Sequence, residues 1–263
     1  MPSGVRSRPR RAACRSIPDI SLAVGSTQTR LNSAVTIVDL TRFPATHVDA
    51  VNEALGELIE DPDVRALAVV GSLARGDALP GSDVDLLVVV TDEALLDVPR
   101  IIRSGCVVEQ HRYTLAAARD RFDRRPAHVY LLLDSVPLYD PEGLFGELVE
   151  AAKARQKTYQ MPTRDIDLKR YWWRKVRSKL KNALERDDTL LAGFLASTCS
   201  AEIVSDLFAL EGRPPPPVGG TAFARLAELQ TSEDVSALFD GDSIERAQAA
   251  LRLLDPILRE LPD

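Results

Sequence analysis

Cysteine and histidine, the side chains that build disulfide frameworks and most zinc sites, are scarce in this sequence of 263 residues. The three cysteines are Cys14, Cys106 and Cys199, an odd number of residues that lie far apart. Their spacing excludes a disulfide framework and a cysteine-rich zinc site, and it suits a reducing, cytoplasmic location. The three histidines are also scattered, and none has the spacing of a Ser/His/Asp catalytic triad.

An excess of basic charge is missing as well. The net charge is −6, which excludes the globally basic surface of a general nucleic-acid binder. No apolar run approaches the roughly 20 residues that span a bilayer. Hydrophobic residues make up 45% of the chain and charged residues 27%, as in an ordinary soluble protein.

The beginning of the chain lacks acids and apolar periodicity. No acidic residue precedes Asp19, and arginines alternate there with serine, glycine and proline. Such a composition can resemble an organelle transit peptide, but the prolines interrupt any amphipathic helix. We expect residues 1–33 to be a disordered tail or an overextended translation start.

The apolar pattern divides the remainder into two domains. Residues 34–140 predict a small α/β domain, with a helix at 48–60 and four buried strands at 65–70, 84–90, 106–114 and 129–133. A short helix can follow the first strand. Residues 141–263 predict only helices, at 144–155, 167–186, 190–210 and in two or three further segments up to about residue 261.

Two carboxylates stand together at the start of the second predicted strand. Asp83 and Asp85 are two residues apart, so their side chains point to the same side of a strand that is otherwise apolar. Each ionised group raises the pKa of its neighbour by repulsion, unless a cation lies between them. Magnesium is a hard cation that binds one or two carboxylates together with substrate phosphates. The pair therefore predicts a magnesium site.

The turn Gly71-Ser72 supplies hydrogen-bond donors for the phosphate groups that a magnesium ion would accompany. A glycine after a buried strand lets backbone approach a ligand closely, and the N–H groups at the start of the next helix suit phosphate. The Ser72 hydroxyl adds one more donor.

Together these segments resemble the signature of the polymerase-β nucleotidyltransferase superfamily. The resemblance rests on Gly71-Ser72, Ala74-Arg75-Gly76 and Ser82-Asp83-Val84-Asp85-Leu86. It is greatest to small bacterial members such as aminoglycoside and lincosamide nucleotidyltransferases, and it covers residues 65–145 well. The resemblance implies a small mixed-sheet catalytic domain of the α/β (α+β) class, followed by an all-helical substrate-binding domain.

The resemblance also implies a role for each matching residue. Gly71 and Ser72 would bind a nucleoside triphosphate, with Ser82 and Arg75 as further nucleotide-binding candidates. Asp83 and Asp85 would hold two Mg²⁺ ions. The family has a third carboxylate on a nearby strand, which Glu109 matches best. Asp134, at the end of the next predicted strand, is the alternative, and His111 shares a strand face with Glu109.

The helical domain would form one wall of the substrate-binding site. One predicted helix carries a narrow basic stripe, consisting of Arg170, Arg174, Arg177 and Lys181. It is either a solvated face or a surface that neutralises the triphosphate. Trp172 and Trp173 are expected in the core or at the domain interface. The loop Gly212–Pro217 resembles one that shapes the acceptor pocket, but the lysine that often follows it is absent here.

These observations predict transfer of a nucleoside monophosphate, AMP from ATP, to the hydroxyl of a small-molecule acceptor, with release of pyrophosphate. Asp83 and Asp85 would bridge two metals, and Glu109 would act as ligand and general base. A protein acceptor is a second possibility. The alternatives of another class are an antitoxin-like module that acts on a helical RNase and a non-catalytic nucleotide sensor.

Overall fold

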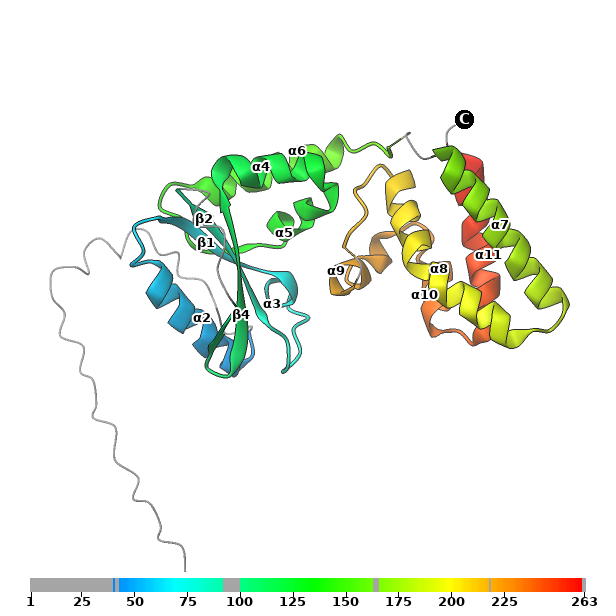
Figure 1. The fold of residues 1–263 in the computed structure, drawn as a ribbon, viewed down its shortest axis with the longest axis horizontal. Helices are drawn as coiled ribbons and strands as arrows, with labels where there is room; N and C mark the ends of the chain where they lie inside the picture. The colour runs from blue at the N-terminus through cyan, green and yellow to red at the C-terminus, as the bar shows by residue number, and fades with distance from the viewer. Residues whose placement is uncertain (1–39, 41–42, 92–99, 163–165, 218, 262–263) are drawn as a thin grey trace, which may run out of the picture.

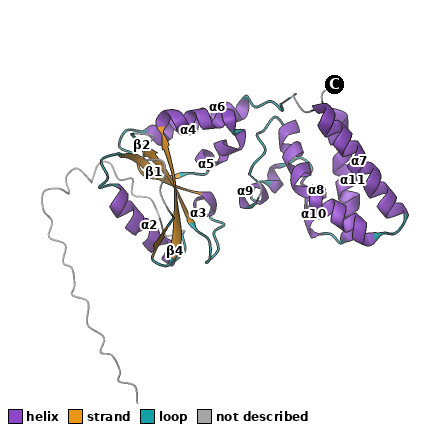
Figure 2. Cartoon of the chain, in the orientation of Figure 1, coloured by secondary structure: helices purple, strands orange, loops and turns teal. Residues whose placement is uncertain are grey.

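The fold was determined as a computed structural model. It describes residue 40 and residues 43–91, 100–162, 166–217 and 219–261. The tail expected at residues 1–33 lies outside the described residues. Strands occur only in the N-terminal half of the described chain, and the C-terminal half is helical (Figure 2). The α/β (α+β) class and the mixed sheet expected from the sequence are confirmed.

The N-terminal half of the described chain is built on a five-stranded mixed sheet in the order β3-β4-β2-β1-β5. The strands are β1 (Val64–Val70), β2 (Val84–Val90), β3 (Ile101–Arg103), β4 (Cys106–Thr114) and β5 (Val136–Tyr139). The two central strands, β1 and β2, pair antiparallel, and β4 pairs parallel to β2. Because β1 and β2 are buried on both faces, they appear in the sequence as continuous runs of Val, Leu and Ala.

Helices cover both faces of this sheet (Figure 1). Helix α2 (Ala45–Leu58) packs on the face formed by Leu67, Val69, Leu86 and Val88. The other face packs against helices α4 (Leu115–Arg124), α5 (Val129–Leu133) and α6 (Leu144–Lys157). The Asp140 carboxylate fixes the start of α6 by accepting hydrogen bonds from the N–H groups of Leu144 and Phe145, at 2.7 and 3.0 Å.

Three of the four predicted strands are confirmed, and the fourth is wrong. Residues Val129–Leu133 form helix α5, and the strand that joins the sheet is the next segment, β5. Helix α5 follows a short 3-10 turn, Pro126–His128, which places a helix start where the apolar run begins. Strand β3 and helix α4 were not expected.

The boundary between the two parts also differs from the expected position at residue 141. Helix α6 buries Phe145, Leu148 and Ala152 in the core that it shares with the sheet. A separate apolar core holds the later helices together. The two cores therefore divide after α6.

The helical part contains α7 (Ile166–Glu185), α8 (Thr189–Leu210), α9 (Gly220–Phe223), α10 (Ser232–Asp240) and α11 (Ser243–Glu260). Trp173 is buried between α7 and α8, and its indole N–H donates to Asp206 at 2.6 Å. Trp172, in contrast, is 43% exposed, so its expected place in the core is wrong.

Helix α8 is the one described helix that is long and apolar enough, by length and composition, to cross a membrane. Glu202 and Asp206 interrupt its apolar residues, so the helix contains no continuous apolar run of about 20 residues. More than half of this apolar window is buried within the protein, as in the central helix of a bundle.

Candidate active site

The site is assembled by the parallel pairing of β2 and β4. In this register Asp85 lies directly opposite Glu109, and His111 follows two residues later on the same face of β4. The ligand atoms of Asp85, Glu109 and His111 all lie within 4.8 Å of one another. All three residues are partly exposed, so the group is open to a ligand.

Each carboxylate of this cluster has one basic neighbour. The Nε2–H group of His111 donates to Asp85 Oδ1 at 3.1 Å. Arg100 pairs with Glu109 at 2.6 Å through a side chain that is 75% exposed. The histidine fixes the orientation of the Asp85 carboxylate and leaves its second oxygen for a cation, as partners of metal-binding carboxylates do.

Gly71 leaves the space that the Asp85 carboxylate occupies. It follows β1, which is the strand on the other side of β2, and its φ is +70°. A Cβ atom at this position would lie 2.3 Å from Asp85 Oδ2. Only glycine therefore allows the turn after β1 to approach this carboxylate so closely.

Asp83 precedes β2 and lies beside the cluster, outside the group of three. It lines a cavity of about 340 Å³ together with Ser82, Arg100 and Glu109. The Ser82 hydroxyl accepts a hydrogen bond from the Leu79 N–H at 2.9 Å and so closes the turn before β2. The residues present suit a hard divalent cation, because carboxylate oxygens from two neighbouring strands converge beside an open cavity.

A buried histidine that the sequence did not single out supports this turn. His47 of α2 is fully buried, and its Nε2–H donates to the Ser82 carbonyl oxygen at 3.0 Å. The contact joins residues 35 positions apart, so no local pattern could have revealed it. For His111 a signal did exist, namely its period-two spacing from Glu109.

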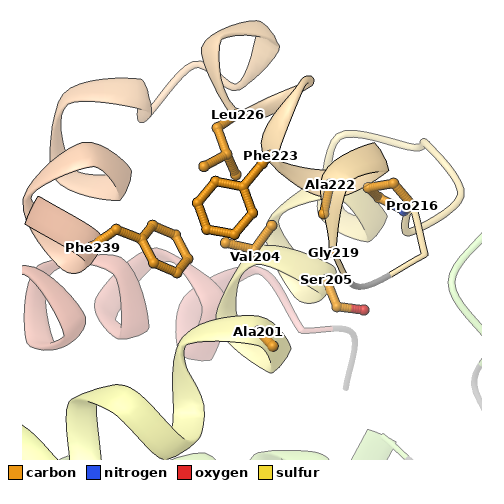
Figure 3. Close-up of a pocket in the computed structure, with 9 residues that line it drawn as sticks. All are labelled: Ala201, Val204, Ser205, Pro216, Gly219, Ala222, Phe223, Leu226 and Phe239. Atoms are coloured by element: carbon orange, nitrogen blue, oxygen red, sulfur yellow. The ribbon is translucent and has the colours of Figure 1, made fainter. Parts of the chain in front are cut away.

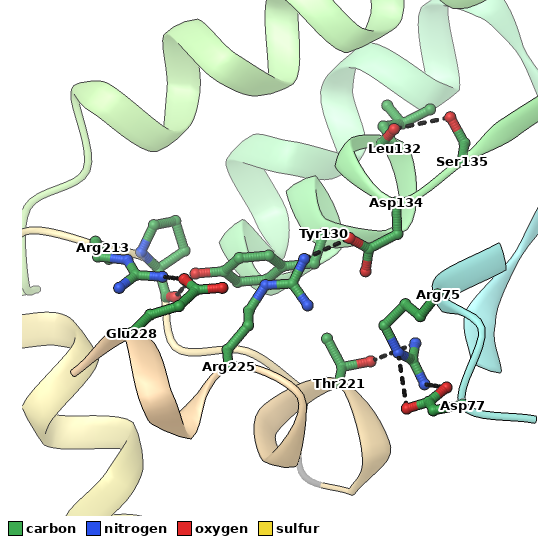
Figure 4. A network of polar contacts seen from close by, with 11 residues as sticks. Arg75, Asp77, Tyr130, Leu132, Asp134, Ser135, Arg213, Thr221, Arg225 and Glu228 are labelled. Carbon is green, nitrogen blue, oxygen red and sulfur yellow. Dashed lines mark hydrogen bonds and ion pairs between the residues drawn. The ribbon is translucent and has the colours of Figure 1, made fainter. Parts of the chain in front are cut away.

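The structure assigns Arg75 partners other than a phosphate group. Its guanidinium group donates to the Thr221 hydroxyl at 3.0 Å and pairs with Asp77 at 3.2 Å (Figure 4). Thr221 belongs to α9, so the short helix α3 (Gly71–Arg75) contacts the helical part through this arginine. Ser72 lies in the first turn of α3 and is partly exposed.

Asp134, the alternative third carboxylate, is also engaged elsewhere. It pairs with Arg225, whose guanidinium carbon lies 4.5 Å from the centre of the Tyr130 ring (Figure 4). The Tyr130 hydroxyl in turn donates to the Pro214 carbonyl oxygen at 2.7 Å. These contacts join the sheet part to the proline loop, and Asp134 is not one of the three residues of the cluster around Asp85.

Two residues of the basic stripe on α7 contact α11 or the residue that follows it. Arg177 pairs with Asp255 of α11 at 2.8 Å, and Arg170 donates to the Leu261 carbonyl oxygen at 3.1 Å. Figure 1 shows α7 and α11 together on the side of the helical part remote from the sheet. The alternative in which this stripe neutralises the triphosphate is therefore not supported.

A small apolar hollow of about 50 Å³ lies within the helical part (Figure 3). Phe223 and Phe239 form one wall, with ring centroids 5.0 Å apart. Its size admits a water molecule or a methyl group but no substrate ring.

The comparisons with known proteins agree with this geometry. The profile of the family described as "Nucleotidyltransferase domain" matches residues 48–190, which is more than half of the chain. No curated protein is similar enough to count as a match.

Among solved structures, the chain is similar to a nucleotidyltransferase-like protein from Exiguobacterium sibiricum 255-15. The sequence identity is 15%, the TM-score is 0.40, and the alignment covers 80% of this chain and 73% of the other. This likeness is too low to support a further conclusion. The match to residues 48–190 spans Gly71, Asp83, Asp85 and Glu109, and the chain belongs to the nucleotidyltransferase domain family.

Proposed function

We propose that this protein transfers AMP from ATP to the hydroxyl group of a small-molecule acceptor and releases pyrophosphate, with two Mg²⁺ ions, in the cytoplasm. The observation that carries the proposal is the position of Asp85. Its carboxylate lies between Gly71 on one side and Glu109 on the other. A group that binds phosphate and a group that can accept a proton thus flank the same cation ligand.

The residues have distinct roles in this proposal. The backbone at Gly71 and the hydroxyl of Ser72 donate hydrogen bonds to the triphosphate. Asp83, Asp85 and Glu109 hold the metal ions, and His111 keeps Asp85 oriented through its 3.1 Å hydrogen bond. When bound, the ions neutralise the phosphate charge and lower the pKa of the acceptor hydroxyl. A carboxylate oxygen of Glu109 accepts the hydroxyl proton.

Arg100 is the partner of Glu109 that a bound cation would replace. In the structure the two side chains pair at 2.6 Å, and both line the cavity that contains Asp83. Binding of a cation by Glu109 replaces this exposed pair. Since surface ion pairs contribute only about 0–1 kcal/mol, the exchange costs little.

Binding of a fluorescent ATP analogue, measured with and without Mg²⁺, tests the donor half of the proposal. We expect Asp83→Asn and Asp85→Asn to abolish the Mg²⁺-dependent part of the binding. Asp49→Asn is the matched control, because Asp49 is an exposed residue of α2 and the same charge is removed there.

Transfer itself is measured with α-labelled ATP and a panel of hydroxyl acceptors. We expect Glu109→Gln to lower turnover by roughly 10²–10⁴-fold while ATP still binds. Parent-like turnover in Glu109→Gln would remove its role as base, and parent-like metal dependence in Asp85→Asn would refute the proposed site.

A further inference from the structure

The cluster beside β2 combines two kinds of ligand atom. Asp85 and Glu109 offer carboxylate oxygens and His111 offers an imidazole nitrogen, with all three atoms within 4.8 Å of one another. Among the residues that the structure describes, no other set of three or more His, Cys, Asp or Glu side chains converges in this way. Asp83 lies outside the set. The cluster therefore differs from a pair of acids that binds a cation through oxygen alone.

The register of the sheet holds His111 in this cluster. Strands β2 and β4 run parallel, with Asp85 opposite Glu109 and Leu87 opposite His111. Side chains two residues apart on a strand share a face, so the imidazole and both carboxylates rise from the same side of the sheet. These three side chains are between 21% and 33% exposed. An ion can therefore reach all of them, while their neighbours limit how far they rotate.

The distance between two of the ligand atoms suits a shared cation. His111 Nε2 lies 3.1 Å from Asp85 Oδ1, where the structure has a hydrogen bond. A divalent ion with ligand bonds of about 2.1 Å places two neighbouring octahedral ligands about 3.0 Å apart. The ion can thus replace the proton between these atoms with almost no movement of either side chain. Glu109 then completes a set of three protein ligands.

Replacing that proton requires a lone pair on Nε2 of His111. A neutral imidazole carries one proton, which can be on either nitrogen. Within the described part of the chain, Asp85 is the only hydrogen-bond partner of His111. Its Nδ1 can therefore take the proton without losing a contact with the protein, and Nε2 is then free to bind a metal. In His128, by contrast, Nδ1 already accepts a hydrogen bond from Arg121.

An imidazole ligand changes which ions the cluster prefers. Mg²⁺ is a hard ion that binds through oxygen and keeps several of its water ligands. Imidazole nitrogen favours the ions of the first transition-metal row, which carboxylate oxygens bind as well. Two carboxylates and one imidazole therefore match a transition-metal ion better than they match Mg²⁺. The carboxylate of Asp83, which offers oxygen alone, remains suited to Mg²⁺.

We propose that His111 is a metal ligand, and that Asp85, Glu109 and His111 together hold a divalent transition-metal ion in place of one of the two Mg²⁺ ions. The inference rests on the proposed function, from which it takes the metal-binding role of the two carboxylates. Without an ion, His111 orients Asp85 through its hydrogen bond. When an ion binds, Nε2 donates its lone pair to the ion instead.

Calorimetric titration of the full chain with Mn²⁺ and with Mg²⁺, without nucleotide, tests this preference. We expect the parent to bind Mn²⁺ at least tenfold more tightly than Mg²⁺. His111→Gln keeps an N–H donor for Asp85 but removes the imidazole nitrogen, so it should reduce the ratio of the two affinities at least tenfold. An unchanged ratio in this variant, within twofold, would overturn the inference.

His128→Gln is the matched control for that titration. It makes the same substitution at an imidazole whose Nδ1 is engaged by Arg121 and which lies outside the cluster. Its ratio of Mn²⁺ to Mg²⁺ affinity should equal that of the parent. A loss as large as in His111→Gln would show that removal of a histidine, and not of a ligand, causes the effect, and would contradict the inference.

Pulsed electron paramagnetic resonance of bound Mn²⁺ identifies the ligand directly. In a chain with ¹⁵N-labelled histidine, coupling of the Mn²⁺ electron spin to ¹⁵N shows an imidazole bound to the ion. The coupling should occur in the parent and in His128→Gln and be absent from His111→Gln. Asp85→Asn should lose the bound ion altogether. Bound Mn²⁺ that depends on Asp85 but has no coupling to histidine would also overturn the inference.

Nucleotide assays separate this inference from the proposed function. If His111→Gln keeps the parent ratio while ATP binding still depends on Asp85 and a divalent cation, the inference fails and the proposed function stands. If the parent binds Mn²⁺ through His111 but binds no ATP and labels no hydroxyl acceptor, the proposed function fails. The cluster would then remain a transition-metal site.

Discussion

The smallest residue of the candidate site sets how closely the turn Gly71-Ser72 approaches the Asp85 carboxylate. A Cβ at Gly71 would lie 2.3 Å from Asp85 Oδ2, and the φ of +70° disfavours any other residue. We predict that Gly71→Ala displaces the Asp85 carboxylate and lowers turnover at least a hundredfold. It should also lower the free energy of unfolding by about 2–3 kcal/mol, because steric overlap adds to backbone strain.

Gly76 provides the matched control for that prediction. Its φ is +84°, but a Cβ there would meet nothing within 4 Å. Gly76→Ala should therefore lose about 1 kcal/mol of stability through backbone strain and keep its turnover. Urea unfolding and steady-state kinetics on both variants check this. Equal losses of turnover in the two variants would show that the strain, and not the contact with Asp85, is responsible.

His47 supports the turn that precedes β2 and so affects the position of Asp83. Its hydrogen bond to the Ser82 carbonyl oxygen fixes the residue that precedes Asp83. His47→Ala would leave that carbonyl without its donor in a buried place, and we predict a loss of about 1–3 kcal/mol in stability. The Mg²⁺ concentration needed for half-maximal activity should rise as well. His47→Gln keeps a donor and should recover part of both effects.

What the sequence could reveal at this scale depended on distance along the chain. Gly71, Asp83 and Asp85 lie within 15 residues, so strand periodicity was enough to predict that they belong to one site. For Glu109 the resemblance implied only a third carboxylate on a nearby strand. The parallel pairing of β2 and β4 places Glu109 opposite Asp85, and its role as a metal ligand stays a prediction. His47 could not be found, because its contact depends on how α2 packs under the sheet.

The contact between α5 and the segment after α9 holds the two parts of the molecule in place. Arg225 and Asp134 form an ion pair with side chains only 11% and 13% exposed. Arg225→Ala would leave Asp134 largely buried without a partner, and we predict a loss of about 3 kcal/mol in the free energy of unfolding. The double variant Arg225→Leu/Asp134→Leu should recover most of it. Urea unfolding of the single and double variants gives the answer.

Short elements were the least predictable part of the fold. The run Val129–Leu133 is five apolar residues long, and such a run fits a buried strand or one buried face of a helix equally well. The true strand, β5, contains Pro137, which argued against a strand although it lies at the sheet edge. Long periodic helices such as α7 and α8 were found within one residue at each end.

The whole molecule should lose stability in mild acid because of His128. Its pKa is about 4 in the folded protein and near 6.5 in an unfolded chain. Between these values the unfolded chain binds a proton that the folded protein does not, so the free energy of unfolding falls as pH falls from 6.5 toward 4. Above pH 6.5 His128 makes no contribution to the pH dependence of the free energy of unfolding. Urea unfolding at a series of pH values should show a smaller slope in His128→Gln.

Polar contacts join the sheet part of the molecule to the helical part. Apolar clusters lie on both faces of the sheet, and a third cluster holds α7, α8 and α11 together. The joining contacts are Arg75 with Thr221, Arg225 with Asp134, and Tyr130 with the Pro214 carbonyl (Figure 4). Interfaces of this polar kind permit relative movement of the parts.

The cavity lined by Asp83 and Glu109 also contains a cysteine, Cys106, whose reactivity can report whether the site is occupied. Cys106 lines it together with Asp83 and Glu109, is 7% exposed, and directs its thiol at the Thr46 carbonyl oxygen, 3.7 Å away. The other described cysteine, Cys199, is buried in the helical core. In a Cys14→Ser variant, a thiol-specific dye should therefore label Cys106 first. Saturating ATP with Mg²⁺ should slow that labelling at least tenfold, which turns a reaction rate into a direct readout of how much of the site is filled.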